Sequence, residues 1–388
     1  MSPIRPILFT AWFWLAAAAW VNAAELQWNL TTEAGQSSNI FDSPEEKADR
    51  YTLSGATLRG TIGHDDRQVA FAVSVAQKKL ARYDFGDERT IESEFVYRVV
   101  RGDVAATLEA AFARQDGGDL FASIGGVDIG YRSERNRLAF AGSLATTGRV
   151  GTTTLTASYR SLRHGEARFN QPGLLPVRLE PQYGENAASI RHDVSLGIQQ
   201  IAAKVSWIGS RIPEEDRDLY VRYPAQVAAL SAIWAASFVP GFAVQVEAGS
   251  ANLVADELGE YAGWYPFYGA EAKWALGDHA SISAGIGRSL MLAEIDDAVA
   301  EDVRKSVIRL ASRLSDAMEV ELAWEHSASH QLYFDYPTQS RTWSAGLAWQ
   351  ISNGVSAKLA YAGKRHDEFD PAFGYSGRQV SVSLNARF

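Results

Sequence analysis

The last residues of the chain alternate strictly between apolar and polar side chains. The apolar positions are followed by polar ones at every step, and the two sets are Val380, Val382, Leu384, Ala386 and Phe388 against Gln379, Ser381, Ser383, Asn385 and Arg387. A period of two is the pattern of a β-strand with one apolar and one polar face. The chain is therefore predicted to close on an amphipathic strand with an aromatic last residue.

The same alternation runs backwards through the chain and is interrupted by short turn sequences. An Asn-Gly pair between two alternating runs is the strongest short signal for a hairpin, and Ser352-Asn353-Gly354 provides one. Further turns are predicted at Arg101-Gly102-Asp103, Val239-Pro240-Gly241, Leu276-Gly277-Asp278 and Ser315-Asp316. The pattern predicts about 18 strands, within a range of roughly 16 to 20, in one antiparallel sheet.

Aromatic residues near the strand ends favour a membrane barrel over a soluble sandwich. Both folds alternate, but only a barrel in a bilayer needs girdles of aromatic side chains at its two interfaces. Candidate girdle residues are Trp264, Tyr265, Phe267, Tyr268 and Trp274. The predicted fold is all-β, a single transmembrane antiparallel up-and-down β-barrel in the cell outer membrane of a Gram-negative bacterium.

Composition and charge agree with this fold and exclude other chemistry. Hydrophobic residues make up 46% of the chain, yet beyond the first segment no apolar run is long enough for a spanning helix. The chain has no cysteine, which excludes disulfides and thiolate catalysis, and its net charge of −9 argues against a nucleic-acid partner.

The first residues have the layout of a secretory signal. Arg5 precedes an apolar stretch from Ile7 to Val21, and small residues follow at Ala23 and Ala24. We expect residues 1–23 to be a cleaved signal peptide and residues 24–388 to form one barrel domain.

Longer, charged connections alternate with the short turns and predict which end faces outward. In outer-membrane barrels the long loops are extracellular and the short turns periplasmic. The long connections are 38–50, 170–186, 211–224, 292–302 and 329–339. The loop 170–186 carries three prolines and is a candidate for folding inward to constrict the pore.

Function is expected on the polar face, which would line the lumen. Across a tight hairpin the polar residues of both strands share a face, and this puts positive and negative charges together. The candidate lumen-lining residues are Arg309, Arg313, Glu319, Glu321, Glu325, Glu247, Lys358 and Arg387. Such a mixture would solvate polar solutes without strong selection for ion sign, or would only stiffen the wall through pairing.

Each candidate motif for catalysis, cofactor binding or metal binding is better explained by a structural role. His326 and His330 have a helical metal spacing, but in a strand they lie about 13 Å apart. Ser327 beside His326 would point to the opposite face. The acidic stretch 294–302 lacks the spacing of a calcium loop, and Arg101-Gly102-Asp103 is better explained as a turn. We expect no enzyme and no cofactor.

Two segments resemble a known family. Residues 35–41, Gly-Gln-Ser-Ser-Asn-Ile-Phe, look like the signature after the first strand of the putative β-barrel porin type 2 group, which includes EpsL-like proteins of exopolysaccharide operons. Residues 361–367 and 375–378 resemble its closing hairpin, although Ser37 stands where the family usually has Asp. The resemblance implies a barrel of about this size that is associated with polysaccharide and has no catalytic residues.

The expected function is an outer-membrane channel for polar solutes, with exopolysaccharide export as the leading case. The alternatives are a structural or assembly barrel with a plugged pore and an enzyme embedded in the barrel. The expected partners are membrane lipid and lipopolysaccharide, the barrel assembly machinery, and polysaccharide with periplasmic export components.

Deleting Phe388 should lower the amount of protein in the outer membrane, because the assembly machinery reads the terminal aromatic strand. Membrane fractionation and immunoblotting would measure this. Normal accumulation of the deletion variant would contradict our use of the terminus.

Overall fold

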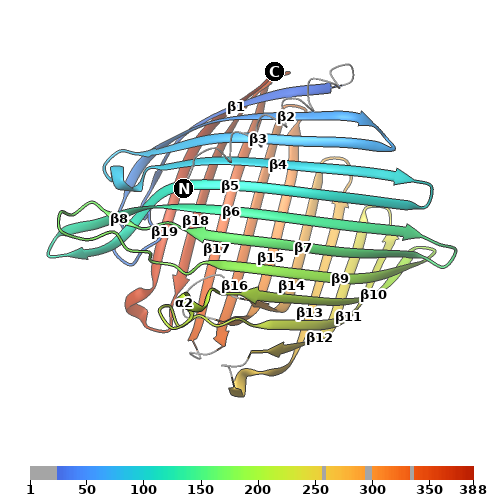
Figure 1. Ribbon diagram of the computed structural model, residues 1–388. Coiled ribbons are helices and arrows are strands. Elements are labelled where there is room, and N and C mark those ends of the chain that lie inside the picture. Colours follow the sequence, from blue (N-terminus) through green and yellow to red (C-terminus); the bar gives the residue numbers. More distant parts are fainter. Residues whose placement is uncertain (1–23, 256–258, 293–298, 333–335) are drawn as a thin grey trace.

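One antiparallel sheet closes on itself to form the wall of a barrel (Figure 1). The computed structural model describes residues 24–255, 259–292, 299–332 and 336–388. Each wall strand pairs with the next, and the first, β1 (Ala24–Ser37), also pairs with the last, β19 (Tyr375–Arg387). The short β8 (Arg168–Phe169) pairs only with β6, while β7 pairs directly with β9. The wall therefore has 18 strands, which confirms the prediction of about 18.

The remaining wall strands are 13 to 21 residues long. They are β2 (Asp49–His64), β3 (Arg67–Leu80), β4 (Glu88–Arg101), β5 (Val104–Ile124), β6 (Val127–Thr147), β7 (Thr152–His164), β9 (Tyr183–Leu196), β10 (Gln199–Arg211), β11 (Gln226–Val239), β12 (Phe242–Val254), β13 (Gly263–Leu276), β14 (Ala280–Leu292), β15 (Ala300–Ser315), β16 (Met318–Leu332), β17 (Tyr336–Ser352) and β18 (Val355–Asp367). The helical elements are α2 (Glu214–Arg217) and the 3₁₀ turns η2 (Asp84–Gly86), η3 (Gly259–Tyr261) and η4 (Pro371–Phe373). No helix among the described residues is long and apolar enough to cross a membrane.

The pairing register keeps one set of side chains on the outside all the way round the ring. On β1 the exposed residues Leu26, Trp28 and Leu30 point outward, and on β19 the exposed residues Val382 and Leu384 do the same. Their alternate neighbours, including the buried Ser381 and Ser383, point inward. An apolar belt on the outside and a polar inner face are the arrangement of a membrane barrel with a wet lumen.

The aromatic residues predicted as a girdle divide between the two faces. Trp264, Tyr268 and Trp274 point outward and are exposed, as the prediction requires. Tyr265 and Phe267 occupy odd positions on β13 and therefore point inward, so the prediction is wrong for these two. The reason is the two-residue period of the strand, which sends adjacent aromatic residues to opposite faces.

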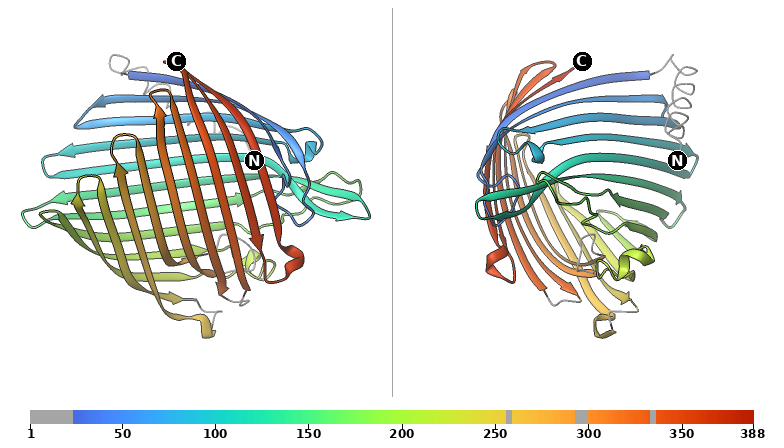
Figure 2. Two further views of the ribbon diagram at one scale, coloured as in Figure 1. Left: turned by 180° about the vertical axis from the view of Figure 1, so that it is seen from behind. Right: turned by 60° about the vertical axis from the view of Figure 1, so that its left-hand side comes forward.

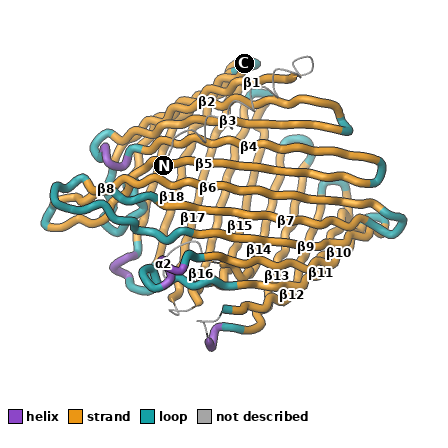
Figure 3. The backbone as a smooth tube through the Cα atoms, viewed as in Figure 1, coloured by secondary structure: helices purple, strands orange, loops and turns teal. Residues whose placement is uncertain are grey.

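The two ends of the barrel differ, although two of the predicted long connections are shorter than expected. Most of the predicted connection 329–339 belongs to strands, because β16 ends at Leu332 and β17 begins at Tyr336, and residues 183–186 of the predicted loop 170–186 belong to β9. The first described residues and Phe388 lie at the same end of the barrel, where Trp28 and Phe388 exchange backbone hydrogen bonds of 3.1 and 2.9 Å. The short turns lie at this end too (Figure 2). Figure 3 shows the longer loops gathered at the other end, around β8 and α2. By the usual sidedness of these barrels, the loop end is extracellular.

The predicted turns are found between strands, with one difference in geometry. Gly102, Gly241 and Gly277 have positive φ angles of 57°, 83° and 68°, as turn glycines do. Asn353 and Gly354 do not have positive φ. At Gly354 a Cβ atom would lie only 2.7 Å from the carbonyl oxygen of Arg387, so the glycine is required by the close approach of the last strand.

Asn39 closes the seam between the first and last strands at the extracellular end. Its buried side-chain amide donates to the carbonyl oxygens of Ser376 (3.1 Å) and Ser43 (2.7 Å), and its carbonyl oxygen accepts from the Ser43 amide (3.2 Å). Beside it, Ser38 and Arg378 are joined by two further bonds of 2.9 Å. The segment after β1 and the start of β19, which are far apart in sequence, thus meet in space and are held together by hydrogen bonds.

Replacing Asn39 by Ala should destabilise the barrel by about 2 to 4 kcal/mol, because three side-chain hydrogen bonds of a buried amide are lost. Urea unfolding of the refolded protein would measure the change. Asn252→Ala on the outer face of β12 is the control, since no hydrogen bond to its side chain is found among the described residues, and it should change stability by less than about 0.5 kcal/mol. Equal effects of the two substitutions would contradict this role of Asn39.

Candidate functional site

The inner face of the wall carries charges of both signs along β15, β16 and β18. The structure places Arg309, Arg313, Glu319, Glu321 and Glu325 on this face, and the register sets Arg313 directly opposite Glu319. The ion pairs that form involve neighbouring residues. Lys305 contacts Glu325 at 2.7 Å, and Lys358 reaches Glu321 at 4.0 Å. The wall therefore presents a mixed electrostatic surface to the lumen.

The two remaining candidates also point inward but lie elsewhere on the wall. Glu247 on β12 accepts a hydrogen bond of 2.7 Å from the buried Ser231 hydroxyl. Arg387 lies at the turn end of β19, opposite Asn29 of β1. The eight candidates are thus spread along the lumen and do not converge on one catalytic centre.

Further inner-face charges follow the same alternation and were not singled out from the sequence. Arg191 and Asp193 on β9 form a bidentate pair with a shortest contact of 2.6 Å, and Gln200 donates to the same carboxylate at 2.9 Å. Opposite them, β7 presents Thr152 and Thr154. The alternation of β9 was the signal that could have found this pair.

A groove of about 340 Å³ lies in the lumen wall along β12 to β15. Its floor is backbone, because Gly269, Gly285 and Gly287 fall on the inner face of β13 and β14. A Cβ atom at Gly269 or Gly285 would meet nothing closer than 3.6 Å, so tight packing does not explain these glycines. Glycine inside a strand often marks a place where another group approaches closely.

Charged residues of both signs border this groove. Its lining includes Glu247, Glu271, Lys305 and Arg309. Lys305 is paired with Glu325, whereas no ion-pair partner of Arg309 is found among the described residues. The groove thus combines an open floor with donors and acceptors at its edges, which suits a polar ring-sized group.

At the extracellular mouth, two loops are held together around a buried carboxylate. Asp216 of α2 is fully buried. Its carboxylate accepts hydrogen bonds from the guanidinium of Arg178 and from the backbone amide of Gln182, the latter at 2.8 Å. Arg178 also donates to the Tyr220 hydroxyl (3.2 Å), which in turn donates to the Arg178 carbonyl oxygen (2.7 Å). These contacts tie the loop 165–182 to the loop 212–225 at the rim.

The hairpin of β5 and β6 projects past the rim and rests on its neighbours. Phe85 of η2 packs on Gly130 of β6 so closely that a Cβ atom there would lie 2.1 Å from its ring. Phe85 also stacks on Phe41 with a centroid distance of 5.4 Å. Near the hairpin tip, Lys47 pairs with Asp128 at 2.6 Å. The predicted loop 38–50 is thus fixed against a strand far from it in sequence.

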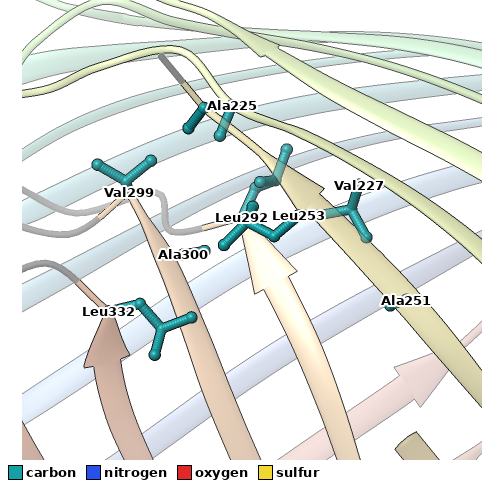
Figure 4. Close-up of a cluster of buried hydrophobic side chains, with 9 residues drawn as sticks. Ala225, Val227, Ala251, Leu253, Leu292, Val299, Ala300 and Leu332 are labelled. Atoms are coloured by element: carbon teal, nitrogen blue, oxygen red, sulfur yellow. The ribbon is translucent and has the colours of Figure 1, made fainter. Parts of the chain in front are cut away.

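A buried apolar cluster marks an overlap in the opposite part of the rim (Figure 4). Pairing of β13 with β14 ends at Tyr268 and Arg288, beyond which the two strands part. Val227 and Leu253 point inward by their register, whereas Leu292, Ala300 and Leu332 belong to the outer face of their strands. Because the two sets pack together, the ends of β14–β16 lie on the lumen side of β11–β13 and narrow the mouth there.

His164 lies buried at the loop end of β7, beneath the loop 165–182. Its Nδ1 is 3.0 Å from a carboxylate oxygen of Glu180, which also pairs with Arg135 at 2.9 Å. Burial lowers the pKa of His164 below its usual 6.5, and Arg135 and Arg178 act in the same direction, while Glu180 opposes them. His164 is therefore neutral at pH 7.

The other sequence-predicted chemistry does not assemble into a site. His326 stacks on Trp324 of the same face at 6.1 Å, while Ser327 has the opposite, inward register. Within the described part of the chain, no three His, Asp or Glu side chains are grouped to hold a metal ion. The residues 294–297 of the acidic stretch lie outside the described residues, as does the predicted signal peptide.

Comparison with known proteins supports the fold and leaves the family open. No known family model matches the chain, and no curated protein matches it. The ferric enterobactin receptor PfeA of Pseudomonas aeruginosa, solved with enterobactin, is similar in structure with a TM-score of 0.54 and 10% identity over 94% of this chain and 82% of that chain. The siderophore receptor PirA of Acinetobacter baumannii gives 0.53 and 8% over 94% and 80%. The FrpB iron transporter of Neisseria meningitidis gives 0.50 and 9% over 93% and 81%.

At this level of identity the likeness concerns the fold alone. Together with the closed wall and the apolar belt, it defines the class: the chain is an outer-membrane β-barrel of 18 strands. The predicted fold and location are therefore confirmed. The expected membership of the porin type 2 group is not matched by a family model.

Lowering the pH should loosen the loop 165–182, because protonation of His164 is unfavourable where it is buried. The pKa of His164 is lowered from its usual 6.5, so the folded loop keeps its full stability above pH 6.5 and loses stability as the pH falls below that value. Since the chain has no cysteine, a spin label at Leu175→Cys would report the loop's mobility cleanly. Mobility should rise between pH 7.5 and pH 5.5, and His164→Gln should remove most of this dependence. The same pH profile in both proteins would rule out His164 as the cause.

Proposed function

We propose that this protein is a non-enzymatic outer-membrane channel that passes polar solutes. The main support for this proposal is the inner face, which presents polar residues and charges of both signs around a closed ring of 18 strands. Barrels of 16 to 18 strands are wide enough for an aqueous path. The likeness to receptor and transporter barrels supports a role in transport across the outer membrane.

We further propose that the solutes are neutral and rich in hydrogen-bonding groups, as oligosaccharides are. Mixed charge on the wall suits solutes that form many hydrogen bonds and carry little net charge. The glycine-floored groove adds a flat place where a sugar ring could lie against backbone, between Glu247 and Arg309. Polysaccharide export is the case that the resemblance of the two end segments implies, and neutral oligosaccharides are the probe that follows from it.

The competing proposal is a barrel with a plugged pore, in which the loop 165–182 would block the lumen. This loop contains residues 170–182 of the segment 170–186 predicted to fold inward, and its described contacts tie it to the rim through Asp216, Arg135 and β6. Under our proposal it sets the width of the mouth and leaves a path open.

Purified protein in a planar bilayer should give stepwise ionic currents with weak preference for either ion sign. Heat-dependent gel mobility would establish that the protein is folded. A folded protein that never conducts would favour the plugged barrel and overturn the channel.

Filling the groove should weaken the interaction with sugars. Neutral oligosaccharides are expected to block the current transiently. Gly285→Leu should shorten these blocks severalfold, because its side chain would enter the groove, where the Cβ atom has only an ordinary contact of 3.6 Å with the Ala270 carbonyl oxygen. Ala139→Leu on the inner face of β6 is the control and should leave block times unchanged. Equal block times in all three proteins would contradict a role for the groove while leaving the channel itself in place.

A further inference from the structure

A second cavity of about 640 Å³ opens on the lipid-facing side of the wall at the extracellular end. It spans the seam where β19, β1 and β2 meet, and the segment after β3 completes it. Gln36, Arg50 and Val380 have outward registers on these strands, and Tyr361 on β18 lies opposite Val380. The cavity therefore faces the outer leaflet of the membrane and not the lumen.

Three arginines gather at this cavity without acidic partners. Arg50, Arg82 and Arg378 all line it and are exposed. No ion pair or hydrogen bond of their guanidinium groups is found among the described residues. The site thus holds three cations that are available to an external anion.

The single acid that lines the cavity is already engaged. Asp49 is buried, and its carboxylate accepts from the backbone amides of Arg50 (2.7 Å), Arg82 (3.0 Å) and Tyr83 (3.3 Å). These bonds, with the 2.9 Å bond from the Ala81 amide to the Arg50 carbonyl oxygen, hold the segment after β3 against β2. Asp49 therefore positions the backbone of Arg50 and Arg82, and its carboxylate forms no ion pair with the guanidinium group of either residue.

The cavity changes from charged to apolar toward the middle of the membrane. Tyr361 and Val380 form the edge of the cavity that lies nearer the turn end of the barrel. The exposed Leu359 and Val382 continue the apolar surface in the same direction. A ligand with an anionic head and several acyl chains would match this order, since arginine binds phosphate bidentately and the apolar strip receives hydrocarbon.

We infer that this cavity binds the phosphorylated glucosamine head of lipopolysaccharide, with Arg50, Arg82 and Arg378 on phosphate and Tyr361 and Val380 beneath the first methylenes. A lipid held here bridges the last strand, the first two strands and the segment after β3. It therefore reinforces the seam of the barrel from the outside. This role is independent of what passes through the lumen.

The test uses the full barrel in neutral detergent and bisphosphorylated hexa-acyl lipid A as the probe, with binding followed by native mass spectrometry. The variant R50Q/R82Q/R378Q should bind at least tenfold more weakly than the unmodified protein. The matched control is R67Q/R101Q/R149Q, which removes the same charge from exposed arginines at the turn end and should bind normally. Lipid A without phosphates should bind the unmodified protein as weakly as intact lipid A binds the triple variant.

Three results would overturn the inference. They are equal binding by the triple variant and the unmodified protein, equal binding of phosphatidylglycerol and lipid A, and displacement of lipid A by millimolar inorganic phosphate. Heat-dependent gel mobility would check that each variant folds. If the triple variant does not fold, the single variants R50Q, R82Q and R378Q decide, and each should weaken binding severalfold.

Discussion

The structure depends on closing the hydrogen-bond ladder between the first and last strands. In hydrocarbon, an unpaired backbone amide or carbonyl costs several kcal/mol, so a sheet can cross a bilayer only when it has no open edge. Here β1 pairs with β19 from Asn29 and Arg387 to Ser37 and Gln379. Because side chains alternate with a period of two, this register also decides which residues meet lipid. A slip of one residue would turn Val380 and Val382 into the lumen and Ser381 and Ser383 into the membrane.

Closure also explains why the two ends of the chain carry its most recognisable residues. Asn39 and Ser376 are 337 positions apart, yet they share a hydrogen bond at the extracellular end of the seam. The same region gathers Arg50 and Arg378 on its outer side. Residues 35–41 and 375–378 are thus structural neighbours, and their hydrogen bonds hold the seam together.

The lumen and the rim have different physical tasks. The wall offers a polar, mixed-charge surface whose ion pairs, such as Lys305 with Glu325, are partly exposed, so each contributes little to stability. The rim instead buries ionisable groups. Asp216 and His164 are buried there, and loop residues supply their partners, namely Arg178 and Gln182 for Asp216 and Glu180 for His164.

The sequence by itself determined the class of fold, an approximate number of strands, the places of the turns, and the inward direction of residues such as Arg309 and Glu321. These follow from a local period of two, interrupted by turn residues, and a local period can be read without knowing what packs on it. Only the tertiary structure decided the contacts of Asn39 with Ser376, Phe85 with Gly130 and Asp216 with Arg178, as well as the overlap near Leu253. Those contacts join segments that come together only after the ring has closed, and they lie in loops and strand ends, where no period constrains the side chains.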